Sequence, residues 1–331
     1  MPFRDVVGHH RLRDLLRRSI SGGTLPPSLL FTGPSGVGKR LTAISVAQTL
    51  NCLKSGDDAC GQCAACTRIA RGVHPDVVIV EPGESGAIKI DQVRDVVERA
   101  NYRPFEGRRR VVIVDEADAL VVPAQNALLK TLEEPPPSSM FILVTARPDV
   151  LLPTVRSRCP QLRFRPLAAD DIATVLVARG QNETSARAVA ATADGSVGQA
   201  LAASADELVE ARDLAVHVLA QASAHGEPGR RIAGAQDLLA KTGAGGATDR
   251  DQLASHLRAM ASLLRDVEVL ATGADARALA NPDVRPALDR LTTAYRGDRG
   301  VRAFAAVDEA LVALERNAGV KIVADWLVLQ L

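Results

Sequence analysis

The sequence predicts an α/β fold with a parallel sheet in its first half and a second half made of helices. Apolar runs occur at residues 77–80, 111–114 and 141–145, and residues 28–31 are expected to form a further short buried strand. Such runs are typical of parallel strands that are covered on both faces. Helical patterns separate the runs, and after about residue 165 the strand-like runs stop. We therefore expect a doubly wound sheet followed by helical domains.

The first strand, at residues 28–31, ends in a Gly-Pro-Ser-Gly turn that leads into a helix. Apolar residues with helical spacing mark the other elements of this half. Helices are expected around Leu12, Leu16 and Ile20, and over residues 39–50, 91–100 and 124–134. This alternation places the α/β domain at residues 1–165.

The second half divides into two parts. Short helices are expected between residues 168 and 203, which gives a small helical domain at 166–205. From about residue 206 the pattern is helical to the end, which gives a domain at 206–331. One apolar stripe in this domain is formed by Leu253, Leu257, Met260, Leu264 and Val267.

Composition excludes some classes of protein. The 331 residues carry a net charge of +1, so the chain is not a broadly basic DNA-coating protein. Any contact with nucleic acid must be local or shared with partners. The sequence shows neither a secretory signal nor an apolar run of membrane-spanning length. We expect a cytoplasmic protein with no membrane partner.

A phosphate loop follows the first strand. Its glycines let backbone N–H groups converge on phosphates, the helix N-terminus adds positive potential, and the lysine reaches the outer phosphates. An ordinary glycine-rich turn is the alternative. The loop is formed by Gly33, Pro34, Ser35, Gly36, Val37, Gly38 and Lys39.

The next residue departs from this motif. Serine or threonine normally offers a hydroxyl to magnesium there, whereas this chain has Arg40, which cannot bind a cation. Thr42 lies two residues too late to replace it. The loop is thus expected to allow ATP or ADP to bind, with Arg40 adding positive charge, but Mg²⁺-assisted hydrolysis is in doubt.

Two acids end the buried strand at residues 111–114, in the arrangement of a Walker B motif. Asp115 is expected to hold magnesium through water, and Glu116 to orient the attacking water. Such a pair can instead cap a helix. The phosphate loop upstream favours the catalytic interpretation.

Four of the five cysteines lie close together, with the spacing C-x7-C-x2-C-x2-C at Cys52, Cys60, Cys63 and Cys66. In a reducing compartment this clustering favours a metal over disulfides. Four thiolates complete a tetrahedron, so we expect a closed, structural Zn²⁺ site at residues 52–66. Free or buried thiols are the alternative.

Two further features have weaker signals. Arg158 lies in a Ser-Arg-Cys triplet, where it is either a surface residue or an arginine that acts on a neighbouring nucleotide, and Cys159 is expected to pack in the core. The basic run at residues 107–110 is either a solvated strand entrance or a DNA contact.

Five stretches resemble the clamp-loader branch of the AAA+ proteins. The most specific reads N-A-L-L-K-T-L-E-E-P, at residues 126–135. The other four stretches are residues 6–9, 31–39, 111–118 and 153–159. The cysteine segment that follows the phosphate loop in sequence adds to the likeness. The likeness covers about residues 1–205. It implies an AAA+ P-loop domain, a small helical lid and a C-terminal helical collar. It also implies a ring of gamma/tau and delta subunits that loads a sliding clamp onto primer–template DNA.

Departures from the family pattern indicate which kind of subunit this is. Motor subunits of the gamma/tau type keep a hydroxyl after the lysine and an arginine in a G-S-x-R motif, where this chain has Arg40 and Gly198. Both losses affect the chain's own hydrolysis, which would leave Asp115 and Glu116 as remnants. Arg158, which would act in trans on a neighbour, is retained. The pattern resembles the non-hydrolysing delta-prime type; a gamma/tau-type ATPase or another AAA+ remodeller are the alternatives.

Overall fold

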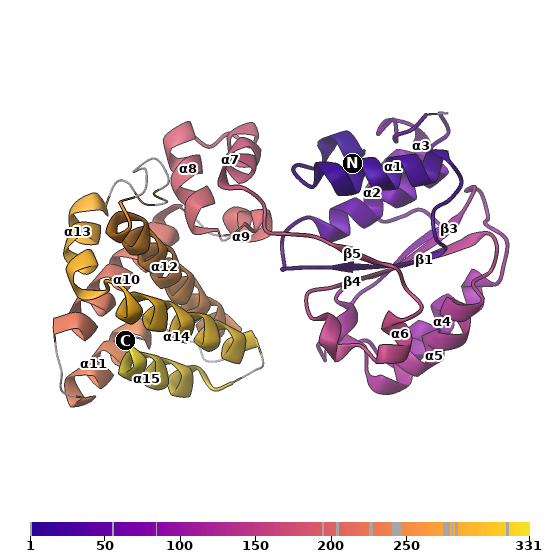
Figure 1. Cartoon of the computed structure of the whole chain (residues 1–331). Helices are drawn as coiled ribbons and strands as arrows, with labels where there is room; N and C mark the ends of the chain where they lie inside the picture. The colour runs from indigo at the N-terminus through magenta and orange to yellow at the C-terminus, as the bar shows by residue number, and fades with distance from the viewer. Residues whose placement is uncertain are drawn as a thin grey trace. The chain divides into compact units, whose positions relative to one another are not determined.

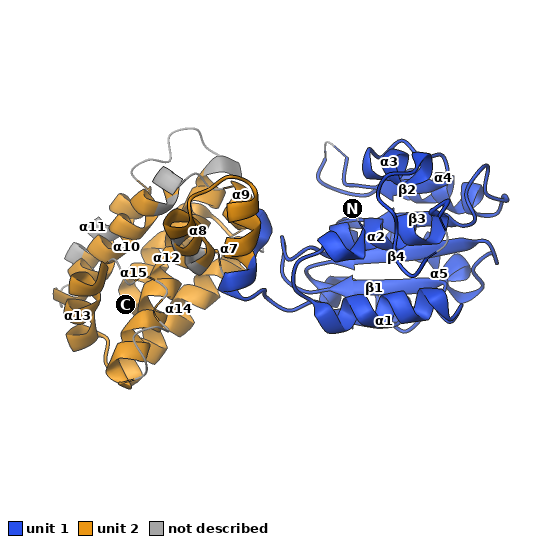
Figure 2. Ribbon diagram, turned by 90° about the horizontal axis from the view of Figure 1, so that it is seen from above, with its two compact units in different colours: residues 1–171, 196–198 blue, residues 172–195, 199–331 orange. Residues whose placement is uncertain are grey.

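The computed structural model describes residues 2–331 except for 55, 84, 194, 203–204, 225–227, 240–246, 274–278, 280, 282–283 and 316–317. The chain forms two compact units (Figure 2). The first comprises Met1–Asp171 and Ser196–Gly198, and the second Ile172–Gly195 and Gln199–Leu331. Whether the lid and collar expected at 166–205 and 206–331 are separate domains remains a prediction.

The first unit is built on a five-stranded parallel sheet with the order β2-β3-β4-β1-β5. The inner strands are buried along their whole length, which explains their runs of valine, isoleucine and leucine. The strands are β1 (Ser28–Thr32), β2 (Val77–Val80), β3 (Arg110–Val114), β4 (Ser139–Thr145) and β5 (Gln161–Arg163).

Helices cover both faces of the sheet (Figure 1). One core packs Leu16, Val46 and Ile69 against one face, and a second packs Val96 and Leu128 against the other. The first face is covered by α1 (His10–Ser21), α2 (Lys39–Asn51) and α3 (Ala64–Ala70). The other is covered by α4 (Ile90–Ala100), α5 (Val122–Glu133) and α6 (Pro153–Arg156). The expected doubly wound α/β fold is confirmed.

In its described residues the second unit is helical. Its core includes all five residues of the predicted stripe, which are all buried: Leu253, Leu257, Met260, Leu264 and Val267. The helices are α7 (Ala169–Ala178), α8 (Glu183–Thr192), α9 (Val197–Ala202), α10 (Ala205–Ala224), α11 (Pro228–Leu239), α12 (Ala247–Ala271), α13 (Arg285–Ala294), α14 (Asp298–Glu315) and α15 (Val320–Gln330). None of the helices in the described ranges is both long and apolar enough to cross a membrane.

Candidate nucleotide and metal sites

The phosphate loop joins β1 to α2, and its glycines are required by the backbone. Gly33 has a φ of 136°, and a Cβ on it would lie 2.2 Å from the Phe164 carbonyl oxygen. Gly36 has a φ of 74°, and its Cβ would lie 2.1 Å from Oγ of Ser196. L-residues with side chains rarely adopt such angles, and neither position has room for one.

Lys39 is turned back onto the loop. Its side chain is buried, and Nζ donates hydrogen bonds of 2.6 Å to the carbonyl oxygens of Gly33 and Pro34. Burial lowers the pKa of the Lys39 ammonium to about 8, although Asp115 and Asp118 act in the opposite direction. The lysine must leave these carbonyls to reach a phosphate.

Arg40 points to the acids at the ends of the neighbouring strands. Its guanidinium donates to Oδ2 of Asp115 at 3.2 Å and also pairs with Glu81. The Thr42 hydroxyl donates to the Gly38 carbonyl oxygen at 2.9 Å, so it is engaged inside α2. Arg40 thus engages the carboxylate that the sequence assigns to magnesium, and any cation would have to compete with it.

A polar network lies just beyond Asp115. Glu116 has a left-handed backbone with a φ of 48°, which is uncommon for a residue other than glycine. Burial, followed by the charges of Asp115 and Asp118, raises the pKa of the Glu116 carboxyl. Asp118 accepts hydrogen bonds from Oγ1 of Thr145 at 2.7 Å and from Nε of Arg147 at 2.9 Å. The sequence marks Thr145 as part of a sensor region and Asp118 as part of the acidic strand end, but their contact arises only where β4 and the Asp118 turn meet in the folded chain.

The residues around Gly198 pack directly on the phosphate loop. The Gly198 N–H donates to the Gly36 carbonyl oxygen at 3.0 Å. A Cβ on Gly198 would lie 2.9 Å from the Gly36 Cα. An arginine at this position therefore does not fit unless the segment moves away from the loop.

The four clustered cysteines come together beside α2 and α3. Their Sγ atoms all lie within 4.8 Å of one another. A tetrahedral Zn–S₄ site with bonds of about 2.3 Å separates its sulfurs by about 3.8 Å, so only small shifts would be needed to hold an ion. The Gln48 side chain donates to the Cys66 carbonyl oxygen at 2.7 Å, which fixes the cluster to α2. The cluster could hold a metal ion such as zinc.

Backbone N–H groups point at these sulfurs. Sγ of Cys60 accepts from the N–H groups of Gln62 and Cys63 at 3.5 and 3.3 Å. These bonds lower the pKa of the Cys60 thiol to about 6, whereas burial raises that of Cys66 to about 12. Donors aimed at sulfur favour the thiolate, which is the form that binds metals.

Arg158 follows α6 and is held at the end of α5. Its guanidinium pairs with Oε2 of Glu133 at 3.1 Å and donates to the Thr154 carbonyl oxygen at 3.0 Å. Its side chain is 30% exposed. The phosphate loop, Arg40 and Asp115 are brought together by the fold, whereas the described contacts of Arg158 go to α5 and α6. Cys159 is buried as predicted, and burial raises the pKa of its thiol to about 11.

The basic run at residues 107–110 is fixed by two buried polar side chains. Asp76 accepts from the backbone N–H groups of residues 105–107 and pairs with Arg110 at 3.0 Å. Oδ1 of Asn51 accepts from the backbone N–H groups of residues 108 and 109. Arg110 is 8% exposed, so its charge serves the fold rather than a DNA surface.

Comparison with known proteins identifies residues 8–168 as a match to the family described as "DNA polymerase III, delta subunit". The DNA polymerase III subunit delta' of Pseudomonas aeruginosa is 44% identical over 134 residues, which is 40% of this chain and 41% of that protein. The subunit delta' of Bacillus subtilis is 35% identical over 203 residues, which is 61% of each.

The subunit tau of Bacillus subtilis is 34% identical over 206 residues, or 60% of this chain and 36% of tau. The chain thus spans less than two thirds of each of these relatives. A solved gamma-subunit-related protein from Thermotoga maritima aligns with 96% of this chain and 97% of its own at 18% identity and a TM-score of 0.40. The fold assignment accordingly rests on the chain's own sheet order and phosphate loop. Over residues 8–168, just under half of its length, this chain is similar to DNA polymerase III subunits of the delta' and gamma/tau types.

Proposed function

We propose that the chain is a delta-prime-type subunit of the DNA polymerase III clamp loader, acting in DNA replication in the cytoplasm. The match of residues 8–168 supports membership of the loader. The ion pair between Arg40 and Asp115 carries the choice of subunit, because it places a fixed positive group on the carboxylate that a hydrolysing site needs for magnesium. ATP or ADP could still bind the backbone N–H groups of the phosphate loop without being hydrolysed.

The proposed partners are gamma/tau and delta subunits, the sliding clamp and, through the complex, primer–template DNA. The relatives are themselves DNA polymerase III subunits, which supports this choice. We assign residues 166–205 to a lid and residues 206–331 to a collar that joins the ring. Assembly rather than chemistry is proposed for this unit, because the cysteine cluster that could hold a metal and the phosphate loop both lie in the other unit.

A gamma/tau-type motor subunit is the second candidate, and the likeness to tau favours it. Another AAA+ remodeller, outside replication, is the third. Reconstitution separates them: this chain is mixed with candidate motor and delta subunits, and ATP turnover is measured with and without primed DNA. We expect DNA-stimulated turnover only when all the subunits are present. Equal turnover without this chain would contradict the loader role.

The isolated chain is expected to hydrolyse ATP negligibly. Arg40 engages Asp115, and residue 198 has no arginine to sense the terminal phosphate. The Arg40→Thr variant should bind Mg–ADP about tenfold more tightly than the unaltered chain, because Asp115 is freed and a hydroxyl is supplied. Calorimetric titration with and without magnesium measures this.

Arg94→Thr is the matched control, because Arg94 is an exposed arginine on α4 that pairs with Asp91. It should leave nucleotide binding unchanged. Turnover at a motor rate by the unaltered chain, abolished by Lys39→Ala, would favour the gamma/tau candidate instead.

We propose that the cysteine cluster holds one structural zinc ion. Four thiolates leave no open coordination position, so the ion would stabilise the loop between α2 and α3 rather than act on a substrate. Elemental analysis of protein purified without added metal should give about one zinc per chain. Cys60→Ser should lose the metal, whereas Cys159→Ser, which alters a buried cysteine outside the cluster, should keep it. Metal-free protein with four freely titratable thiols in the folded state would refute the site.

Arg158 is proposed to act in trans, as an arginine finger on the nucleotide of a neighbouring motor subunit. Beside the phosphate loop of this chain, Arg40 forms an ion pair with Asp115, which disfavours hydrolysis here. An arginine that served hydrolysis in this chain would therefore have little purpose. The guanidinium itself contacts Glu133 and Thr154, so it would have to leave these partners to reach the phosphate of a neighbour.

A further inference from the structure

A hollow of about 570 Å³ lies within the helical unit, between α11, α14 and α15. Three arginines, one glutamate and the last residue of the sequence, Leu331, line it, so positive side chains outnumber negative ones. The hollow also exposes part of Trp326, the chain's only tryptophan. It lies in a different unit from the phosphate loop, so it is a separate site.

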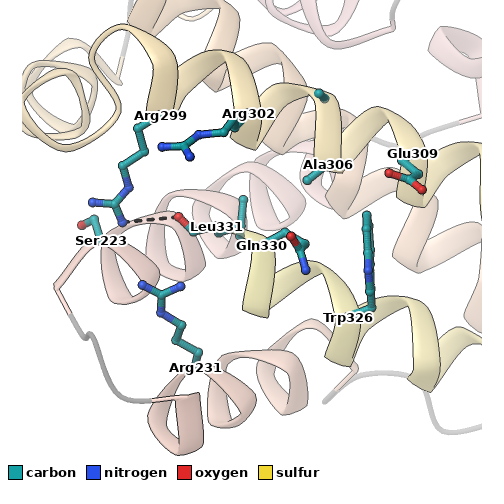
Figure 3. Close-up of a pocket in the computed structure, with 10 residues that line it drawn as sticks. Ser223, Arg231, Arg299, Arg302, Ala306, Glu309, Trp326, Gln330 and Leu331 are labelled. Atoms are coloured by element: carbon teal, nitrogen blue, oxygen red, sulfur yellow. Dashed lines mark hydrogen bonds between the residues drawn. The ribbon is translucent and has the colours of Figure 1, made fainter.

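The positive charge is gathered at one end. Figure 3 shows Arg231, Arg299 and Arg302 grouped around Leu331. Arg299 is positioned by hydrogen bonds of 3.3 Å to the main-chain oxygens of Ala222 and Leu331, the last residue of the sequence, and it lies 5.0 Å from the centre of the Tyr295 ring. Arg302 is one turn away on α14 and is exposed. Guanidinium groups that converge in this way suit a phosphate.

The other end has a different character. Figure 3 places Trp326 and Glu309 together there, on α15 and α14. Along α14, Glu309 follows Arg302 by seven positions, which is about 10 Å of helix axis. The two ends are thus far enough apart for a sugar and a base to lie between a phosphate and the glutamate.

We propose that this hollow binds a nucleotide, with its phosphate at the arginines and its base against Trp326. Stacking on an aromatic face is available to every base, and arginine adds to it. Glu309 accepts a hydrogen bond from an exocyclic amino group, which favours cytosine over thymine. The nucleotide is either free or part of single-stranded DNA, since both present the same phosphate and base.

Glu309 also argues against an acidic peptide as the occupant. A carboxylate beside the tryptophan repels the side chains of such a peptide, whereas it pairs with a base amino group. The inference does not depend on the proposed role in a clamp loader, because binding by the isolated chain is sufficient to test it.

The test follows the emission of Trp326 while the full chain is titrated with short oligodeoxycytidylate. We expect saturable quenching, tighter binding than for oligothymidylate, and an affinity that falls with salt. Arg302→Ala should weaken binding about tenfold and reduce the salt slope by about 0.7. Glu309→Ala should remove the preference for cytosine.

Arg285→Ala is the control, because it removes an exposed arginine of α13 outside the hollow and should leave the affinity unchanged. Deoxycytidine monophosphate distinguishes the two sources: equal affinity identifies a free nucleotide, and much weaker affinity identifies single-stranded DNA. The deoxycytidine monophosphate titration should give the same quenching with the Lys39→Ala variant, since the phosphate loop is not involved. No quenching by either ligand, no effect of Arg302→Ala, or tighter binding of a polyglutamate peptide would overturn the proposal.

Discussion

If the chain acts in the proposed clamp loader, replacing Arg158 with alanine is expected to reduce ATP turnover at one site of that complex by on the order of a thousandfold. The transferred phosphoryl group develops charge that an arginine from the next subunit stabilises. Because one interface is affected, the other sites should keep their rates, and clamp loading should slow in the whole complex. Pre-steady-state ATP turnover on primed DNA measures both effects.

Folding, zinc content and assembly should survive this change. Arg158 gives up a partly exposed ion pair with Glu133 and a bond to the Thr154 carbonyl oxygen, a loss of about 1 kcal/mol or less. Arg158→Lys should rescue poorly, because lysine lacks the planar fork. Arg156→Ala, which alters an exposed arginine two residues earlier, is the control and should leave turnover unchanged. A normal rate of clamp loading by the complex that contains Arg158→Ala, at saturating ATP, would refute the hypothesis that Arg158 is an arginine finger.

Replacing Asp76 with asparagine is expected to lower the free energy of unfolding by about 3–5 kcal/mol. The Asp76 carboxylate is fully buried, accepts three backbone hydrogen bonds and balances the charge of Arg110. The amide of asparagine is neutral and would point hydrogens at donors. Urea unfolding followed by circular dichroism measures the loss. Asp95→Asn, which breaks an exposed pair with Arg99, should change stability by less than about 1 kcal/mol.

The Asp76 carboxylate also makes the free energy of unfolding depend on pH. Burial alone would raise the pKa of Asp76, but the backbone donors and Arg110 outweigh it and lower the pKa from 3.8 to about 2. The folded state thus holds the proton less tightly than the unfolded state. The stabilisation is present above about pH 4 and is lost as the pH falls towards 2. In Asp76→Asn this part of the acid dependence should be absent, and an unchanged acid profile would contradict the assignment.

The sequence predicted the inner sheet well, because strands covered on both faces need uninterrupted apolar runs such as Val111–Val114. The phosphate loop and the four cysteines were equally readable, since their residues are close in the chain. Edge strand β5 was missed: Gln161 and Arg163 are exposed, so it has no apolar run. Helix α3 was missed because it lies inside the cysteine segment, where turn residues dominated the pattern.

Contacts between distant residues could not be predicted. The sequence showed that Arg40 departs from the phosphate-loop motif and that Asp115 is the acid of a Walker B motif. The ion pair between them could not be predicted, because 75 residues separate them in the chain. The same holds for Asp76 and Arg110: the run at residues 107–110 suggested solvent or DNA, and the structure exposes Arg108 and Arg109 but buries the charge of Arg110. Local patterns thus reveal which residues are unusual, and the fold shows what they contact.

Helix α2 and strand β3 are joined at both of their ends. At one end Arg40, near the start of α2, pairs with Asp115, which directly follows β3. At the other end Asn51, the last residue of α2, holds the backbone of residues 108 and 109, which directly precede β3. Both links oppose sliding of α2 along β3. Because the phosphate loop leads directly into α2, displacing the loop along the sheet would require these links to break.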